Sequence, residues 1–165
     1  MLSKECQKYE KNMKLNFIKL ILGYFLIIFF LPKYSNAKAI VFEEIVCEIK
    51  INEKNKTMFF LDVADTSVKR NYGLMNRKSI TPNSGMLFIW KNSQKRTFWM
   101  KNTNFDLDLF FLDKEGQVIE IHKKAKAFSE DIIYSKIKAM FVLELGANQH
   151  QIKKGDKLNC GYLNL

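Results

Sequence analysis

The sequence predicts a mainly β fold: a small, antiparallel, partly closed β-barrel with one short helix, preceded by an N-terminal signal or hydrophobic segment. Three observations lead to this class. Short apolar runs rich in Val, Ile, Leu and Phe recur along the chain, as the strands of a packed sheet require. Turn residues separate these runs, and only one stretch carries both the start and the stop signal of a helix. Six or more short strands joined by hairpin turns are typical of a small barrel.

The β domain is expected to begin near Lys56. Residues 38–55 are mixed in character and are interpreted as a lead-in segment or irregular strand, and residues 56–165 as the domain itself. Its first strand is predicted at residues 57–63, a β-rich run between polar neighbours.

The single helix is predicted at residues 67–72. Asp65 or Thr66 can begin it, because either side chain can accept the first free amide protons. Gly73 ends it, at a position where the chain needs a positive φ. The helix is therefore about two turns long.

Six further strands complete the predicted barrel. A Thr-Pro-Asn-Ser-Gly turn at residues 81–85 precedes the first of them. Residues 107–113 are apolar on both parities, which suits a central strand covered on both faces. Gly116 and Gly155 stand in the turns before two later strands. The six runs are residues 86–90, 97–100, 107–113, 117–121, 139–145 and 157–160.

Residues 1–37 are interpreted as a signal peptide or a membrane anchor of a bacterial protein. Lysines precede an uncharged apolar run at residues 20–31, and small residues precede a cleavage position after Ala37. This run is shorter than the roughly 20 residues that a spanning helix needs. We therefore expect a protein exported to the periplasm or secreted, whose N-terminal segment engages the membrane during export. The alternative is an inner-membrane anchor formed by residues 15–31, and Met13 is a second possible start.

The charge of the exported part restricts its partners. The whole chain has 27 basic and 17 acidic residues. Removing residues 1–37 takes away six lysines and two glutamates, which leaves 21 basic and 15 acidic residues and a net charge of +6. Lys and Glu are scattered rather than blocked, which favours a solvated surface over a nucleic-acid footprint. The expected partner is an envelope ligand or protein, bound by a monomer.

Two cysteines remain in the exported part, Cys47 and Cys160. An even pair in an exported protein permits one disulfide. Two buried thiols are the alternative, since cysteine is among the most buried residue types.

The sequence lacks the common motifs of catalysis. There is no nucleophile elbow, phosphate loop, dinucleotide glycine pattern or His-Glu-x-x-His. His122 and His150 each stand alone among lysines, and with two distant cysteines they do not show zinc-ligand spacing. No metal, no cofactor and no catalytic residue is therefore predicted.

One part of the chain concentrates residues that are costly to place. It reads Arg-Asn-Tyr-Gly-Leu-Met-Asn-Arg at residues 70–77, Gly-Met-Leu-Phe at 85–88 and Phe-Trp-Met-Lys-Asn-Thr at 98–103. This string resembles the hallmark of a widespread bacterial and archaeal family, domain of unknown function 192. The resemblance covers roughly residues 56–158 and implies a β-rich domain without a settled activity. Its structural motif positions here are Gly73, Leu74, Met75, Gly85 and Met86.

The two motif arginines have two interpretations. Arg70 and Arg77 flank the helix end, and arginine is favoured where a carboxylate or phosphate accepts two parallel hydrogen bonds. A structural clamp to Asp106, Asp108 or Asp113 would tie the helix to the central strand. The alternative is an exposed arginine pair that binds an anionic ligand.

The strand after the polar loop adds aromatic and basic groups. Alternation places Trp99 and Lys101 on one face, where they could form a floor for an anionic group or a sugar ring. Alternatively, Trp99 is core and Lys101 extends over it to solvent. The candidate ligand-binding residues are Arg70, Arg77, Trp99, Lys101, Asn102 and Asp108.

Three functional classes follow. The preferred one is a non-catalytic binding module for an anionic or glycan-like ligand of the cell envelope, because charge and stacking groups occur without a poised proton donor. The second is an enzyme that uses Asp108 or Glu144 as acid or base. The third is a structural or interaction protein of the envelope.

Overall fold

The computed structural model describes residues 39–50 and 56–161. Within residues 1–38 it describes seven positions, all helical: Met13, Asn16, Phe17, Lys19, Leu20, Ile21 and Gly23. Most of the predicted signal or anchor, including its apolar centre and the cleavage position after Ala37, lies outside the described residues. Among the described residues, no helix has the length and apolar character to span a membrane. Residues 40–165 form a compact unit.

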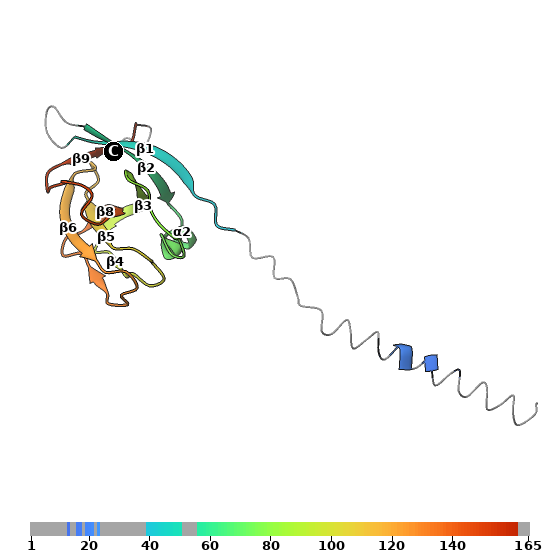
Figure 1. The fold of residues 1–165 in the computed structure, drawn as a ribbon. Coiled ribbons are helices and arrows are strands. Elements are labelled where there is room, and N and C mark those ends of the chain that lie inside the picture. Colours follow the sequence, from blue (N-terminus) through green and yellow to red (C-terminus); the bar gives the residue numbers. More distant parts are fainter. Residues whose placement is uncertain are drawn as a thin grey trace, which may run out of the picture. The chain divides into compact units, whose positions relative to one another are not determined.

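This unit is built on one sheet of seven strands that curls into a half-barrel (Figure 1). The order of the strands across the sheet is β6-β5-β8-β3-β2-β1-β9. Short strands also pair in a second sheet, β4 with β7. The strands are β1 (Glu43–Lys50), β2 (Lys56–Ala64), β3 (Ser84–Gln94), β4 (Thr97–Phe98), β5 (Leu107–Leu112), β6 (Val118–Ala125), β7 (Ile133–Tyr134), β8 (Ala139–Gly146) and β9 (Lys157–Asn159).

The prediction of a mainly β domain is confirmed, but the wholly antiparallel arrangement is wrong at one pair. Strands β2 and β3 are parallel, with Leu61 opposite Gly85, whereas the other pairs of the large sheet are antiparallel. Parallel neighbours require a crossover between them. Here the crossover is α2 (Ser67–Tyr72) together with the irregular segment that follows it.

The two edge strands meet at one end of the curl. The amide of Val118 donates to the carbonyl of Asp156 at 2.9 Å, and the amide of Leu158 donates to the carbonyl of Gly116 at 2.9 Å. An isolated antiparallel bridge between Gln117 and Lys157 lies between these bonds. The hydrogen-bonded contact therefore protects part of both edges from pairing with another chain.

Part of the predicted lead-in segment belongs to the sheet. Strand β1 pairs with β2 along its whole length, from Glu43 opposite Val63 to Lys50 opposite Lys56. Its buried positions are the alternating Ile45, Cys47 and Ile49. The predicted boundary at Lys56 therefore separates two strands that pack together.

The helix forms where it was predicted. The side-chain oxygen of Thr66 accepts the amide of Lys69 at 3.2 Å, which makes Thr66 rather than Asp65 the N-cap. Gly73 ends the helix with φ +53°, a conformation that costs glycine less than any other residue.

Buried side chains form one cluster on each face of the sheet. The cluster inside the curl draws on all seven strands, and Leu87, Phe110 and Leu143 belong to it. It also contains Cys47 and Cys160, which form a disulfide that joins positions 113 residues apart. The cluster outside the curl draws mainly on β3, β5 and β8, and it is covered by the chain around Leu74 and Met100. Every residue of β5 is buried, as expected for a strand covered on both faces.

Candidate functional site

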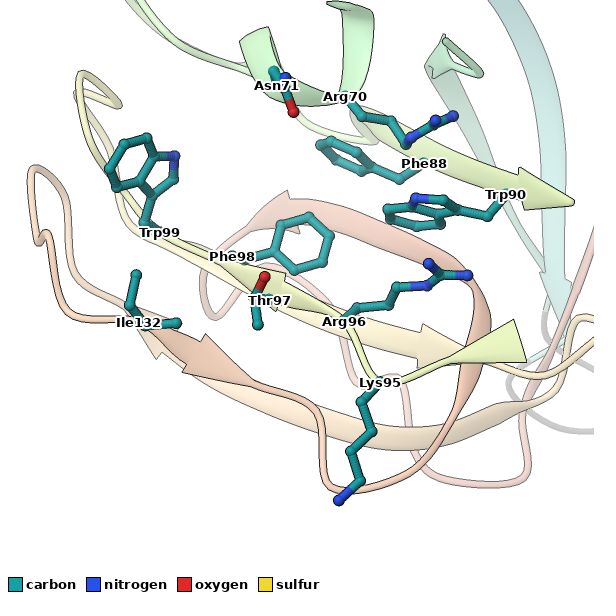
Figure 2. Close-up of a pocket in the computed structure, with 10 residues that line it drawn as sticks. All are labelled: Arg70, Asn71, Phe88, Trp90, Lys95, Arg96, Thr97, Phe98, Trp99 and Ile132. Atoms are coloured by element: carbon teal, nitrogen blue, oxygen red, sulfur yellow. The ribbon is translucent and has the colours of Figure 1, made fainter. Parts of the chain in front are cut away.

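A pocket of about 490 Å³ opens over the outer cluster, between the helix and the β4 segment (Figure 2). Its volume falls in the range of small-molecule sites. Arg70 and Asn71 come from α2, Phe88 and Trp90 from β3, and the rest from β4, its flanks and the chain before β7. The lining residues are Arg70, Asn71, Phe88, Trp90, Lys95, Arg96, Thr97, Phe98, Trp99 and Ile132.

Aromatic rings make up one wall of this pocket. Phe88 stacks on Trp90 with ring centroids 6.1 Å apart, and Phe98 meets Phe88 edge-on at 5.1 Å. Trp99 stands at the opposite end of the pocket in Figure 2 and is 43% exposed. The pocket therefore offers a fixed aromatic surface and one accessible indole.

Two guanidinium groups approach the indole of Trp90. Arg96 lies 4.2 Å and Arg70 5.3 Å from its ring centroid, and in Figure 2 they lie on opposite sides of the ring. Cations within about 6 Å of an indole ring are attracted by its negative face. Trp90 thus holds two like charges near one another.

Backbone carbonyls fix both arginines. Arg70 Nη1 donates to the carbonyls of Asp65 at 2.6 Å and Ile89 at 2.8 Å. Arg96 Nε donates to the carbonyl of Ala139 at 3.1 Å, and its Nη2 donates to the carbonyl of Asn92. Within residues 39–50 and 56–161, neither guanidinium forms an ion pair with a carboxylate. Neither arginine is therefore ion-paired in the described part of the chain, although the pKa of the nearby Asp65 carboxyl is lowered by the hydrogen bond from Lys69 and, to a smaller extent, by the charge of Arg70.

The pKa of Arg96 reflects its burial and also the closeness of the two arginines. Burial, and then the repulsion of Arg70, lowers the pKa of Arg96 from its usual value. Both effects disfavour the charged form. An anion bound in the pocket beside Arg70 would weaken this repulsion and favour the charged form of Arg96.

A second, smaller cavity of about 30 Å³ shares part of this wall. Its lining includes Arg70, Phe88 and Trp99 from the pocket, and also Thr103 and Glu144. Glu144 is 4% exposed, and burial raises the pKa of its carboxyl to about 8. No hydrogen bond or ion pair joins its carboxyl to the described side chains and amides, but its oxygens are not among the fully enclosed polar atoms, so they are open to the cavity.

Comparison with known proteins identifies the family. The family model DUF192, described as Uncharacterized ACR, COG1430, matches residues 48–160. The chain belongs to this family. None of the curated proteins compared with it matches. The resemblance inferred from the Arg70–Thr103 string is therefore confirmed.

Two solved structures have the same fold. A candidate transcription regulator from Sinorhizobium meliloti 1021 is 29% identical, with a TM-score of 0.71 over 74% of this chain and 97% of its own. A protein of unknown function from Novosphingobium aromaticivorans DSM 12444 is 24% identical, with a TM-score of 0.67 over 78% of this chain and 99% of its own. The fold described above is thus shared with these two proteins.

The structure brings together only part of the predicted ligand-binding set. Arg70 and Trp99 line the pocket, and Lys101 lies beyond it, with Nζ 5.1 Å from the Trp99 ring and 3.6 Å from Glu130. Arg77 instead pairs with Asp62.

Two further candidates have structural contacts. Asn102 is exposed with φ +56°, and its carbonyl accepts the amide of Asn76 at 2.8 Å. Asp108 accepts from Lys123 Nζ at 2.9 Å, from the amide of Lys124 at 2.9 Å and from the amide of Asn148 at 3.1 Å.

The predicted arginine clamp to the central strand is wrong. Asp106 accepts the amide of Ala127, and Asp113 accepts the amides of Glu115 and Gln117 within its own turn. Arg77 reaches β2 instead, through Asp62, because its position after the helix end places it beside that strand. Asp62 was not among the predicted partners.

The family glycines have identifiable physical roles. Gly73 has φ +53°, and a Cβ there would lie 3.5 Å from the ring of Phe88. A Cβ on Gly85 would lie 2.2 Å from the carbonyl oxygen of Glu144, so β3 and β8 approach too closely for any side chain. Leu74 and Met86 are buried in the outer cluster, and Met75 lines the smaller cavity.

Sequence reasoning missed Trp90, Arg96 and the neighbours Phe88 and Phe98 as site residues. Trp90 stands at the end of the strand predicted at residues 86–90, and Arg96 directly precedes the strand predicted at residues 97–100, so neither was singled out. Arg96 is only 7% exposed, an unusual state for arginine. The available signal was an arginine placed directly before a β-rich Thr-Phe-Trp run.

Proposed function

We propose that this domain is a non-catalytic binding module for a small anionic ligand that carries a ring. The observation that carries the proposal is the pair Arg70 and Arg96, held on either side of Trp90 without an acidic partner among the described residues. The indole lies between the two guanidinium groups, so a carboxylate, phosphate or sulfate group would pair directly with Arg70 and would act on the charge of Arg96 only at longer range.

The donors of Arg70 support this role. Its described hydrogen bonds use Nη1 alone, which leaves Nε and Nη2 to donate to a ligand. Two parallel donors of one guanidinium match the two oxygens of a carboxylate or a phosphate. The backbone contacts hold the group in place, so that little side-chain freedom is lost on binding.

The aromatic wall supports a ring on the same ligand. Trp99 is accessible at one end of the pocket, and Phe98 lies between it and Trp90 (Figure 2). Flat aromatic surface buries apolar area of a sugar or aromatic ring at a small cost in side-chain entropy. A glycan-derived acid combines both features.

The cell envelope is the proposed location of this ligand. The N-terminal segment has the pattern of an export signal. The Cys47–Cys160 disulfide supports this location, because disulfides persist in oxidising compartments and are rare in the cytosol. Sequencing the N-terminus of the native protein tests whether the chain is exported and cleaved.

Catalysis by a pair of carboxylates is disfavoured by the sheet register. Asp108 lies opposite Leu145, and Glu144 lies opposite Leu109. Neighbouring residues of one strand point to opposite faces, so the two carboxyl groups lie on different sides of the sheet. They cannot act on one bond.

Binding of defined anions tests the proposal. The probes are glucuronate, 4-nitrophenyl phosphate and uncharged methyl glucoside, measured by calorimetry at pH 7 and low salt. Both anions should bind and methyl glucoside should not. Arg70→Gln should weaken anion binding by about tenfold or more, the effect of losing a charged hydrogen-bond donor.

The matched control is Arg77→Gln, which removes an arginine from the same motif but outside the pocket. It should bind the anions as the wild type does. Equal loss in both variants, or no loss in Arg70→Gln, would reject the pocket as the site. Failure of the wild type to bind either anion would reject the binding function.

A further inference from the structure

The outer face of the sheet contains a buried acid, Glu144, that does not line the larger binding pocket. Glu144 is 4% exposed and lines the cavity that adjoins the pocket. Its strand neighbours are Met86 on β3 and Leu109 on β5, both fully buried and apolar. Among the described residues the fully enclosed side-chain polar atom without a partner is His150 Nε2, and the Glu144 oxygens are not of this kind. They are open to the adjoining cavity, where a ligand group could meet them.

The size of the cavity limits what Glu144 can meet. About 30 Å³ is room for one group the size of a water molecule. A ring cannot enter, but a single hydroxyl can. The cavity shares Arg70, Phe88 and Trp99 with the larger pocket, so one ligand could occupy both.

We propose that Glu144 forms a hydroxyl subsite of the pocket, which makes the ligand a hydroxylated acid such as a sugar acid or a sugar phosphate. The acidic group lies at Arg70, the ring lies on the aromatic wall, and one hydroxyl hydrogen-bonds to the Glu144 carboxyl. This inference rests on the proposed binding function and names the class of its ligand.

The protonation state of Glu144 fits this role. With its pKa raised to about 8, the carboxyl is neutral at pH 7 and both donates and accepts a hydrogen bond. A hydroxyl also does both, so the two groups match. A neutral carboxyl does not repel the anion bound nearby.

The surroundings of the subsite contain few other groups that titrate. From α2 the cavity receives Arg70 and Tyr72, and from the segment after β4 it receives Trp99 and Thr103. An ionised Glu144 would place a negative charge beside the bound anion. Above pH 8 the ionised Glu144 should therefore weaken anion binding.

The test compares glucuronate with cyclohexanecarboxylate, which has the same ring size and charge but no hydroxyl. Wild-type protein at pH 7 should bind glucuronate about tenfold more tightly, the value of one well-placed hydrogen bond to a buried group. Glu144→Leu should remove this preference. Glu144→Gln, which retains a donor and an acceptor, should retain most of it.

The pH dependence gives a second readout that is independent of folding yield. Glucuronate affinity should fall between pH 7 and 9 in the wild type and stay constant in Glu144→Gln. Equal binding of the two acids by the wild type, or an unchanged preference in Glu144→Leu, would overturn the hydroxyl subsite while leaving the anion site intact. If neither acid binds the wild type, the proposed function itself fails.

Discussion

The two buried acids of the central strands, Asp108 and Glu144, have opposite surroundings. Asp108 is 1% exposed and lies on the inner side of the sheet, where it accepts hydrogen bonds from a lysine side chain and two backbone amides. Glu144 is 4% exposed on the outer side and has no described partner. Asp108 accepts the amides of Lys124 in β6 and of Asn148 in the turn after β8, whereas Glu144 faces a cavity.

The two faces of the sheet differ in the same way: the inner face stabilises the fold, and the outer face contains the candidate binding site. The inner face contains the larger apolar cluster and the Cys47–Cys160 disulfide, and it maintains the curl. The outer face contains Trp90 with its two arginines and the unpartnered Glu144. Buried polar groups with all their partners usually serve stability, whereas a buried group without them requires another explanation.

Removing the disulfide should give the largest loss of stability. The loop that it closes spans 113 residues, so the double variant Cys47→Ala/Cys160→Ala should lose about 4–5 kcal/mol in the chain-entropy description. Urea unfolding of the oxidised and variant proteins measures this. A midpoint unchanged by reduction would show that the inner face does not depend on the bond.

Asp108→Ala should cost about 3 kcal/mol, because it leaves the amides of Lys124 and Asn148 without their acceptor. Lys123 contributes little, since its side chain is 45% exposed. The control is the exposed acid Asp131, whose replacement by Ala should change stability by less than about 0.5 kcal/mol. Equal losses of stability in the two variants would show that the hydrogen bonds accepted by Asp108 do not stabilise the fold.

Glu144 should make stability depend on pH in a defined direction. Its folded pKa lies above the unfolded value, so the folded state binds the proton more tightly and stability falls as the pH rises from about 4.5 to about 8. The expected slope from this group is about 1.4 kcal/mol per pH unit. Measuring the free energy of unfolding of the wild type and of Glu144→Gln from pH 5 to 9 isolates the contribution of Glu144. The same pH dependence in both proteins would contradict this prediction.

Gly73→Val should cost more than about 1 kcal/mol, because a β-branched residue is strained at φ +53°. The matched control is Gly155→Ala, at a glycine with φ +93° and open space around it, where only backbone strain acts. Thermal unfolding compares the two. An unchanged melting temperature for Gly73→Val would show that the helix end has another conformation.

The sequence predicted the local elements well because their signals are local. The helix and its glycine stop appear at residues 67–73, and strands at 107–113 and 139–145 appear within one residue of their predicted ends. The parallel pairing of β2 with β3 was missed, because pairing depends on which strand the chain meets after its crossover. No local sequence pattern encodes which strands become neighbours.

The site was harder to predict for the same reason. Arg70 and Trp99 were identified from the motif, but Trp90 and Arg96 join them only through the fold. Glu144 was treated as one half of a pair with Asp108, and only the register of β5 against β8 shows that they face apart. Residue type and spacing identify candidates, and three-dimensional packing decides which of them meet.

A direct titration of Glu144 tests the contrast between the two faces. The side-chain carboxyl carbon of Glu144 can be followed by ¹³C NMR from pH 4 to 10 and assigned with Glu144→Gln. Because the carboxyl is buried without a partner, it should titrate near pH 8. Titration near its ordinary value of 4.5 would mean that Glu144 is solvated or hydrogen-bonded as an anion, and the outer face would then hold no neutral acid for a ligand.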